Sequence, residues 1–397
     1  MAAWPKRQMD SLCEVTSSKR IFASDYVSKG VPFYRAKEIG EKHHGNVNVS
    51  TELFISRSQF EQIRARFGAP KGGDVLLTSI GALLGLPYVV KQGEEFYFKD
   101  GNLTWFRNLN GIDSQFLYYW MLSPEGNGEL QKSKIGSAQP AFTINLLKRM
   151  EIGLPPLPIQ RRVAGVLFAY DGLIENNARR IKILAEMAKM IYREWFVSFR
   201  FPGYEKVKMV ESDDGLIPNG WNAKRLGEVL QLEYGKALKS ADRGGGAVPV
   251  FGSSGVVGFH TESLADGPGI IVGRKGNVGS VFFCPSKFWV IDTAYYVHTS
   301  LSQYFLFLNL LTQNFLNNDA AVPGLNRNQA HSLPIIVPDA TTMERFDHLV
   351  APMFRQQTVL RELNTILTKT RDLLLPKLVS GEIEVGKIEA GAIAQGV

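Results

Sequence analysis

The side chains best suited to chemistry are cations, amides and hydroxyls that lie on predicted turns at corresponding places in two parts of the chain. Residues 34–37 (YRAK) align with residues 251–254 (FGSS), for example. Arg, Lys, Gln and Asn can pair with base edges, and Ser hydroxyls suit phosphates. For any single residue, a turn that merely connects two strands is an equally good explanation. The candidates for contact with nucleic acid are Arg35, Lys37, Ser79, Ser137, Gln139, Ser253, Ser254, Arg274, Lys275, Asn277, Asn326 and Arg327.

Catalytic patterns are largely missing. Residues 273–280 (GRKGNVGS) are rich in glycine but lack the G-x-x-x-x-G-K-[ST] spacing of a phosphate-binding loop. No Asp/Asn-Pro-Pro-aromatic segment of an adenine methyltransferase is present, and the six histidines have no metal-ligand spacing. An acid/base pair at residues 94–95 or 213–214 stays an alternative, although both lie in predicted solvated loops.

These candidate residues belong to two unequal copies of one sequence plan. Trp4 and Val31 recur as Trp221 and Val248, a shift of 217 positions in both cases. Residues 140–155 recur as residues 323–338, where the shift has fallen to 183. The falling shift indicates that the first copy is longer in its middle.

Each copy mixes strand and helix patterns. Residues 74–78 and 95–98 are rich in apolar, β-branched or aromatic residues, which predicts strands. Residues 114–122 predict a buried helix, and residues 302–311 predict its counterpart in the second copy. The expected fold class is α+β, with two tandem globular domains of one type.

A long helix with heptad spacing follows each copy. Two apolar series, offset by three residues, predict a coiled-coil seam between these helices. Its predicted members are Leu167, Tyr170, Ile174, Ile181, Leu184, Ile191, Trp195, Met353, Leu360, Leu363, Leu367 and Leu374. In the second helix, Leu349 and Leu363 belong to the same series, and Pro352 predicts a kink or a helix start. The alternative is that each helix packs only on its own module.

The predicted segments are therefore a first module (1–153), a central helix (154–202), a second module (203–338), a C-terminal helix (339–385) and a loosely ordered tail (386–397). If the two helices pack antiparallel, they separate the modules by a rod of up to about 60 Å. One turn of B-DNA is about 34 Å long. Such a rod could hold the two modules at separate places on one DNA duplex.

The charge distribution is compatible with a polyanionic partner. The net charge is +7, made up of +4 on residues 1–153, +4 on 154–202, zero on 203–338 and −1 on 339–385. Cationic surfaces bind nucleic acid by displacing its counterions. Cys13 and Cys284 are the only cysteines, and no apolar run reaches the roughly 20 residues of a membrane helix. We expect a reduced, cytoplasmic protein without a disulfide framework.

The chain resembles the specificity subunit of type I restriction-modification enzymes over nearly its whole length. Three segments carry the resemblance: residues 155–160 (PPLPIQ), 191–196 (IYREWF) and 374–383 (LLPKLVSGEI). Two departures are that Ile159 replaces the family's usual Glu and that the second copy lacks the proline motif. Either departure could alter the docking of a partner.

The resemblance implies two target-recognition domains separated by an antiparallel coiled coil. Each domain would read one half of a split site in double-stranded DNA, and the chain itself would not be catalytic. Its expected partners are two methylation (M) subunits and restriction (R) subunits, with no membrane. S-adenosylmethionine, ATP and Mg would belong to those partners, with no cofactor on this chain. The alternatives are a single-chain DNA methyltransferase or nuclease, and a coiled-coil scaffold that binds proteins only.

Overall fold

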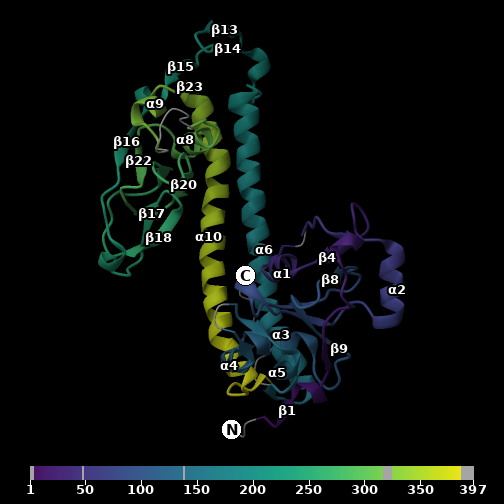
Figure 1. The fold of residues 1–397 in the computed structure, drawn as a ribbon. Coiled ribbons are helices and arrows are strands. Elements are labelled where there is room, and N and C mark those ends of the chain that lie inside the picture. Colours follow the sequence, from purple (N-terminus) through teal and green to yellow (C-terminus); the bar gives the residue numbers. More distant parts are fainter. Residues whose placement is uncertain (1–3, 47–48, 137–138, 316–323, 386–397) are drawn as a thin grey trace. The chain divides into compact units, whose positions relative to one another are not determined.

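A computed structural model describes residues 4–46, 49–136, 139–315 and 324–385 (Figure 1). The predicted tail, residues 386–397, therefore lies outside the described residues. The chain divides into two compact units. Unit 1 comprises residues 1–176 and 364–397, and unit 2 comprises residues 177–363. Each unit holds one module together with a part of each long helix.

The centre of unit 1 is a four-stranded antiparallel sheet in the order β2-β9-β6-β7. A second sheet of order β3-β5-β4-β8 ends in the parallel pair β4 and β8. The strands are β2 (Glu14–Thr16), β3 (Tyr26–Val27), β4 (Val31–Tyr34), β5 (Phe54–Ile55), β6 (Val75–Thr78), β7 (Pro87–Val89), β8 (Tyr97–Phe98) and β9 (Leu103–Arg107). The predicted strands at 74–78 and 95–98 are confirmed as β6 and β8.

Unit 2 repeats this arrangement. Its four-stranded antiparallel sheet has the order β16-β22-β19-β20, and a three-stranded sheet, β18-β17-β21, ends in the parallel pair β17 and β21. The strands are β16 (Leu230–Tyr234), β17 (Val248–Gly252), β18 (Gly255–His260), β19 (Gly269–Gly273), β20 (Val281–Cys284), β21 (Trp289–Val290) and β22 (Ala294–Thr299). The two copies read from the sequence therefore share one sheet topology.

Short elements complete both modules. A two-stranded ribbon joins the start and end of each module, β1 with β12 and β15 with β23. These elements are β1 (Lys6–Gln8), β10 (Lys134–Ile135), β11 (Ala141–Phe142), β12 (Glu151–Gly153), β13 (Met209–Ser212), β14 (Gly215–Pro218), β15 (Asn222–Arg225), β23 (Pro334–Val337), α3 (Ser114–Leu122), α5 (Ile144–Lys148), α7 (Leu226–Val229), α8 (Gln303–Leu310) and α9 (Arg327–His331). The helices predicted at 114–122 and 302–311 are confirmed as α3 and α8.

The greater length of the first module has a structural origin. Helices α1 (Ala36–His43) and α2 (Arg57–Phe67) lie between β4 and β6, where unit 2 has only the hairpin strand β18. Helix α4 (Pro124–Lys132) follows α3 directly, begun by the Ser123 cap and a proline in its first turn. The fall of the sequence shift from 217 to 183 reflects mainly the segment that holds α1 and α2.

The two long helices are α6 (Leu157–Tyr192), which continues into a π-helical turn at Arg193–Val197, and α10 (Ala340–Val379). Within unit 1, Asn364 Nδ2 donates to the Ile174 carbonyl at 3.1 Å. Three residues earlier on α6, Asp171 pairs with Arg371 at 2.6 Å, seven residues later on α10. The helices are therefore antiparallel there. Within unit 2, the end of α6 likewise packs on the start of α10.

The seam of α10 differs from the prediction at Leu363, which is 37% exposed, and at Leu349, which is 43% exposed. The inward-facing series lies one residue later in the sequence. Its members are Val350, Gln357, Asn364, Arg371 and Leu378. Heptad seams alternate steps of three and four residues, and the middle three members of the series reached by the four-residue step are polar here. An apolar pattern could not reveal them.

The remaining predicted seam residues are at least partly covered. Leu167, Trp195 and Leu360 are buried, and Tyr170, Ile174, Ile181, Leu184, Ile191, Met353, Leu367 and Leu374 are half-buried. Pro352 does not start the helix, because α10 begins twelve residues earlier at Ala340. Pro352 is exposed, so water can bind the carbonyl group that loses its helical partner.

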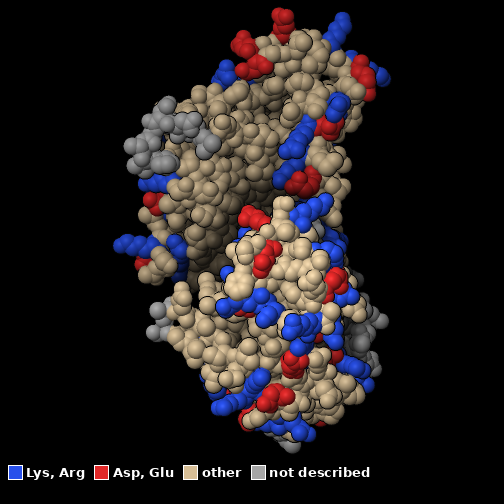
Figure 2. Space-filling model, turned by 45° about the vertical axis from the view of Figure 1, so that its right-hand side comes forward, with Lys and Arg blue, Asp and Glu red and all other residues tan. Residues whose placement is uncertain are grey.

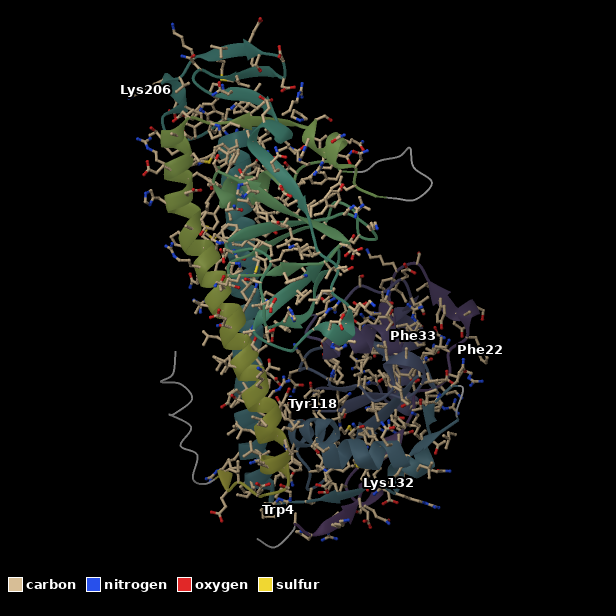
Figure 3. The ribbon with its side chains drawn as sticks, turned by 90° about the vertical axis from the view of Figure 1, so that its left-hand side faces the viewer. Trp4, Phe22, Phe33, Tyr118, Lys132 and Lys206 are labelled. Atoms are coloured by element: carbon tan, nitrogen blue, oxygen red, sulfur yellow. The ribbon has the colours of Figure 1, made fainter. Side chains whose placement is uncertain are left out.

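A tryptophan anchors the start of each module to the end of a long helix. Trp4 lies against Gly381, just beyond α10, where the indole ring leaves no room for a Cβ atom (Figure 3). Its repeat counterpart, Trp221, stacks on Phe201 with ring centroids 5.0 Å apart, just beyond α6. Trp221 Nε1 also donates to Asp339 Oδ2 at 3.1 Å. Each module is thus attached to the helix that follows the other module.

Candidate nucleic-acid interface

Three chain segments converge at one end of the unit 2 sheet. The turn after β17 carries Ser253, whose carbonyl accepts a hydrogen bond from Ser280 Oγ at 2.5 Å. The connection between β19 and β20 carries Arg274, whose carbonyl accepts from the Leu325 amide at 2.8 Å. A β-bridge joins Lys275 to Gly324. The structure thus brings together all the predicted contact residues of the second module.

Glycines allow this close approach. A Cβ atom at Gly273 would lie 2.2 Å from the Asn277 carbonyl oxygen, so only glycine fits there. Gly276 and Gly279 have φ angles of +77° and +75°, in the left-handed region that favours glycine. The stretch 273–280 is therefore a tight strand connection that displays the side chains between its glycines.

An arginine–tyrosine cluster occupies this surface. The guanidinium carbon of Arg274 lies 4.9 Å from the centre of the Tyr234 ring, and that of Arg327 lies 5.3 Å from the same ring. Arg274 also donates to the Asp292 carbonyl at 3.2 Å. The Tyr295 hydroxyl donates to the Leu325 carbonyl at 3.1 Å, and burial raises the pKa of Tyr295, which keeps that donor protonated.

Among the described residues, no carboxylate lies within 4.0 Å of the cationic groups of Arg274, Lys275 or Arg327. Like charges held close together repel each other unless an anion neutralises them. This cluster is therefore a local anion-attracting patch in a module whose net charge is zero. Lys275, Asn277, Arg327 and Ser254 are exposed, so their side chains can reach a ligand.

Two predicted contact residues in unit 2 have structural roles instead. The Ser253 side chain is buried, with 7% of the residue exposed, because the β19–β20 connection packs over it. Asn326 caps α9, and its Oδ1 accepts hydrogen bonds from the amides of Asn328 and Gln329. The oxygen that would recognise a base is therefore already used.

The corresponding end of unit 1 is built in the same way. The Ser79 carbonyl accepts from the Phe142 amide at 3.0 Å, and a bridge joins Ile80 to Ala141. Gln139 is exposed on the hairpin between β10 and β11, and Lys37 is exposed on α1. Ser137 lies outside the described residues.

Ser79 and Arg35 were expected to contact nucleic acid, and the structure occupies both of them otherwise. Ser79 is 3% exposed, and its hydroxyl lies 2.7 Å from Thr104 Oγ1. Arg35 forms a 2.8 Å ion pair with Glu38, which is 1% exposed. Burial opposes ionisation of Glu38, but hydrogen bonds from Arg35 outweigh it and lower the pKa of that carboxyl. The charge of Arg35 is therefore neutralised inside the module.

Tyr234 is a site residue that was missing from the prediction. It is 47% exposed at the last position of β16, directly before Gly235 and Lys236. An aromatic residue beside a cation at a strand end is a weak signal by itself. The repeat could not reveal it either, because the first module has no aromatic residue at the corresponding end of β2.

The two units differ in surface charge. The visible face of unit 1 carries many Lys and Arg side chains intermixed with Asp and Glu, whereas that of unit 2 has a broad uncharged area with charged side chains at its borders (Figure 2). Several unit 1 cations are paired within their module, such as Lys42 with Glu94 and Arg107 with Glu14.

In the described parts of the chain, no group of three or more His, Cys, Asp or Glu side chains could hold a metal ion. None of the described helices is long and apolar enough to cross a bilayer.

Comparison with known proteins shows which family has this sequence pattern and fold. Residues 1–186 and 218–365 match the family described as "Type I restriction modification DNA specificity domain". The MjaIX specificity subunit of a type I restriction enzyme from Methanocaldococcus jannaschii is 26% identical, over 97% of this chain and 94% of that protein. A putative specificity subunit from Haemophilus influenzae, S.HindORF215P, is 27% identical over 47% of this chain and 46% of its own length.

The fold also has a solved counterpart. The crystal structure of a type I restriction-modification S subunit from M. genitalium superposes with a TM-score of 0.64 at 17% identity. The superposition covers 94% of this chain and 96% of that one. The expected fold class, two tandem α+β domains with long helices that pack antiparallel, is confirmed. The family match covers both modules, and the chain belongs to the family of type I restriction-modification DNA specificity subunits.

Proposed function

We propose that this chain is the non-catalytic subunit that selects the DNA sequence in a type I restriction-modification complex, reading a bipartite target with one half-site for each module. The observation that carries this proposal is the duplicated sheet, β2-β9-β6-β7 and β16-β22-β19-β20. The same end of each sheet displays exposed polar side chains on different loops. Two modules with the same sheet but different exposed side chains are suited to recognising two different half-sites.

The side chains that support DNA contact are those left exposed by their own module. In unit 2 they are Lys275, Asn277 and Arg327, with Arg274 supporting the cluster. In unit 1 they are Lys37 and Gln139. Lys and Arg supply the contacts to phosphate that account for most of the affinity, and amide and guanidinium groups can distinguish bases.

The long helices offer a surface for the methylation subunits. On α6, Ile183, Met187 and Met190 are 52%, 44% and 63% exposed. On α10, Ile366 and Leu373, seven residues apart, are 59% and 68% exposed. Apolar side chains thus face outward, while Gln357, Asn364 and Arg371 face inward. Helices with an outer apolar stripe are suited to packing against helices of a partner.

The remaining assignments follow from this role. Two methylation subunits would occupy the helical surfaces, and restriction subunits would join the assembly. S-adenosylmethionine, ATP and Mg would then act on those partners, and this chain would need no cofactor of its own. A complex that modifies and cleaves DNA in this way would operate in the cytoplasm.

The test is a map of methylated positions in DNA from cells that express this chain with its methylation subunit. We expect one bipartite motif, two short defined sequences separated by an unspecified spacer. Replacing residues 1–153 with the module of a relative should change one half of the motif only. A map without any bipartite motif, from a complex that is intact by gel filtration, would contradict the proposal.

A further inference from the structure

We propose that the half-site read by the second module contains a guanine, and that Arg327 recognises this guanine through the major groove from a position fixed by Tyr234. This inference rests on the proposed function, because it assigns a specificity-determining residue to the same DNA-reading surface.

Two rigid elements hold Arg327 in place. Helix α9 packs on β16, and His331 Nε2 of α9 accepts a hydrogen bond from the Leu232 amide of β16 at 3.3 Å. Arg327 precedes His331 by four residues, so both lie on the same face of α9. Tyr234 follows Leu232 by two residues, at the end of β16. The hydrogen bond holds α9 beside β16, and the guanidinium carbon of Arg327 lies 5.3 Å from the centre of the Tyr234 ring.

The contact with the Tyr234 ring restricts the position of the guanidinium group, and because Arg327 is exposed its donors can reach a ligand. Arginine has a planar fork of donors that matches two adjacent acceptors. Guanine offers such a pair, O6 and N7, in the major groove, and this arginine–guanine pair is the commonest base-specific contact. A phosphate needs no such orientation, because any mobile cation can bind it.

The neighbours of Arg327 divide the remaining tasks. Arg274 lies against Tyr234 and Tyr295 and donates to the Asp292 carbonyl, so it supports the stack from within the module. Lys275 is exposed and flexible, as suits a contact with phosphate. Asn326 is committed to the cap of α9. Arg327 is thus the exposed arginine of the cluster, and its side chain makes no hydrogen bond to the described residues of its own module.

The experiment measures binding of the complex of this chain with its methylation subunit to duplexes that carry the mapped motif. Each guanine of the second-module half-site, on either strand, is replaced in turn with 7-deazaguanine, which still pairs with cytosine but lacks the N7 acceptor. At one position we expect the affinity of the wild-type complex to fall by roughly 10-fold. In the Arg327→Ala complex, the same replacement should have no further effect.

Three variants separate base reading from charge. Arg327→Lys keeps the charge but loses the planar fork, and should show a smaller 7-deazaguanine penalty than the wild type. Tyr234→Phe keeps the stacked ring and should retain the penalty. Lys275→Ala should weaken binding to all duplexes alike and also retain the penalty. An intact first half-site in the methylation map of each variant shows that the complex has folded.

Two results would overturn the inference and leave the proposed function standing. One is a bipartite motif whose second-module half has no guanine on either strand. The other is a 7-deazaguanine penalty that persists in Arg327→Ala. A wild-type map without a bipartite motif would instead reject the proposed function itself.

Discussion

At the scale of single residues, the buried polar groups of this chain serve to attach one element to another. Gln160 is fully buried at the start of α6. Its Oε1 accepts from the Asp113 amide at 2.8 Å, and its Nε2 donates to the carbonyls of Gly111 and Pro155 at 3.0 and 2.8 Å. One amide side chain therefore joins the loop before α3 to the first turn of α6.

Replacing Gln160 with leucine should destabilise unit 1 strongly. The change removes three hydrogen bonds to backbone groups, and the expected loss in free energy of unfolding is about 3 kcal/mol. Chemical denaturation of the purified chain measures it. Gln131→Leu on the exposed face of α4 is the matched control, with an expected change of less than about 0.5 kcal/mol. Equal effects of the two substitutions would contradict this role of Gln160.

Glu94 makes the stability of the first module dependent on pH. Burial opposes its ionisation, but hydrogen bonds from Lys42 and Tyr88, both 2.7 Å long, outweigh it and lower the pKa of Glu94. A carboxyl with a lowered pKa stabilises the fold above its unfolded pKa, and this stabilisation is lost as the pH falls through the folded pKa.

We therefore expect wild-type stability to fall on acidification below the ordinary carboxyl range, and Glu94→Gln to reduce that dependence. The measurement is the denaturation midpoint at neutral pH and at about pH 3.5, below the ordinary glutamate pKa. The variant should be less stable at neutral pH, where it lacks the ion pair with Lys42. A pH dependence unchanged from wild type would show that Glu94 is not the titrating group.

At the scale of elements, the sequence predicted the strands and helices better than it predicted which side chains are exposed. The repeat, strands β6 and β8, helices α3 and α8 and both long helices follow from apolar periodicity, because burial selects residue type. The inward series of α10 was placed one residue early, since Gln357, Asn364 and Arg371 lack that periodicity. Ser79 and Ser253 were expected to contact nucleic acid, but both are buried, because small polar residues fit buried turns equally well.

The outer stripe of α6 yields a prediction at this scale. Replacing Met187 and Met190 together with aspartate should abolish co-purification with the methylation subunit, since it places two charges in an apolar contact. Both residues are exposed in this chain, so its own stability should change little. Lys182→Asp, an exposed change on the same helix, is the control and should retain the partner. Retention by the double variant would exclude this stripe as the docking surface.

At the scale of the whole molecule, the antiparallel helices are expected to set the spacing between the two half-sites. Removing one heptad from both helices shortens them by about 10 Å. We expect the methylated motif to keep both halves and to have a shorter unspecified spacer. The methylation map gives the spacer length directly. An unchanged spacer would show that the helices do not set the distance between the half-sites.

The contact between Trp4 and Gly381 brings residues near the two ends of the chain together within unit 1. Trp221, at the same place in the repeat, meets Phe201 across the continuous segment 202–220. The same kind of contact thus joins segments far apart in the sequence in unit 1 and segments close together in the sequence in unit 2. A circular permutant, joined at its original ends and opened between residues 203 and 208, should select the same DNA. The order of the two modules along the sequence would then not determine the order of the half-sites in the DNA.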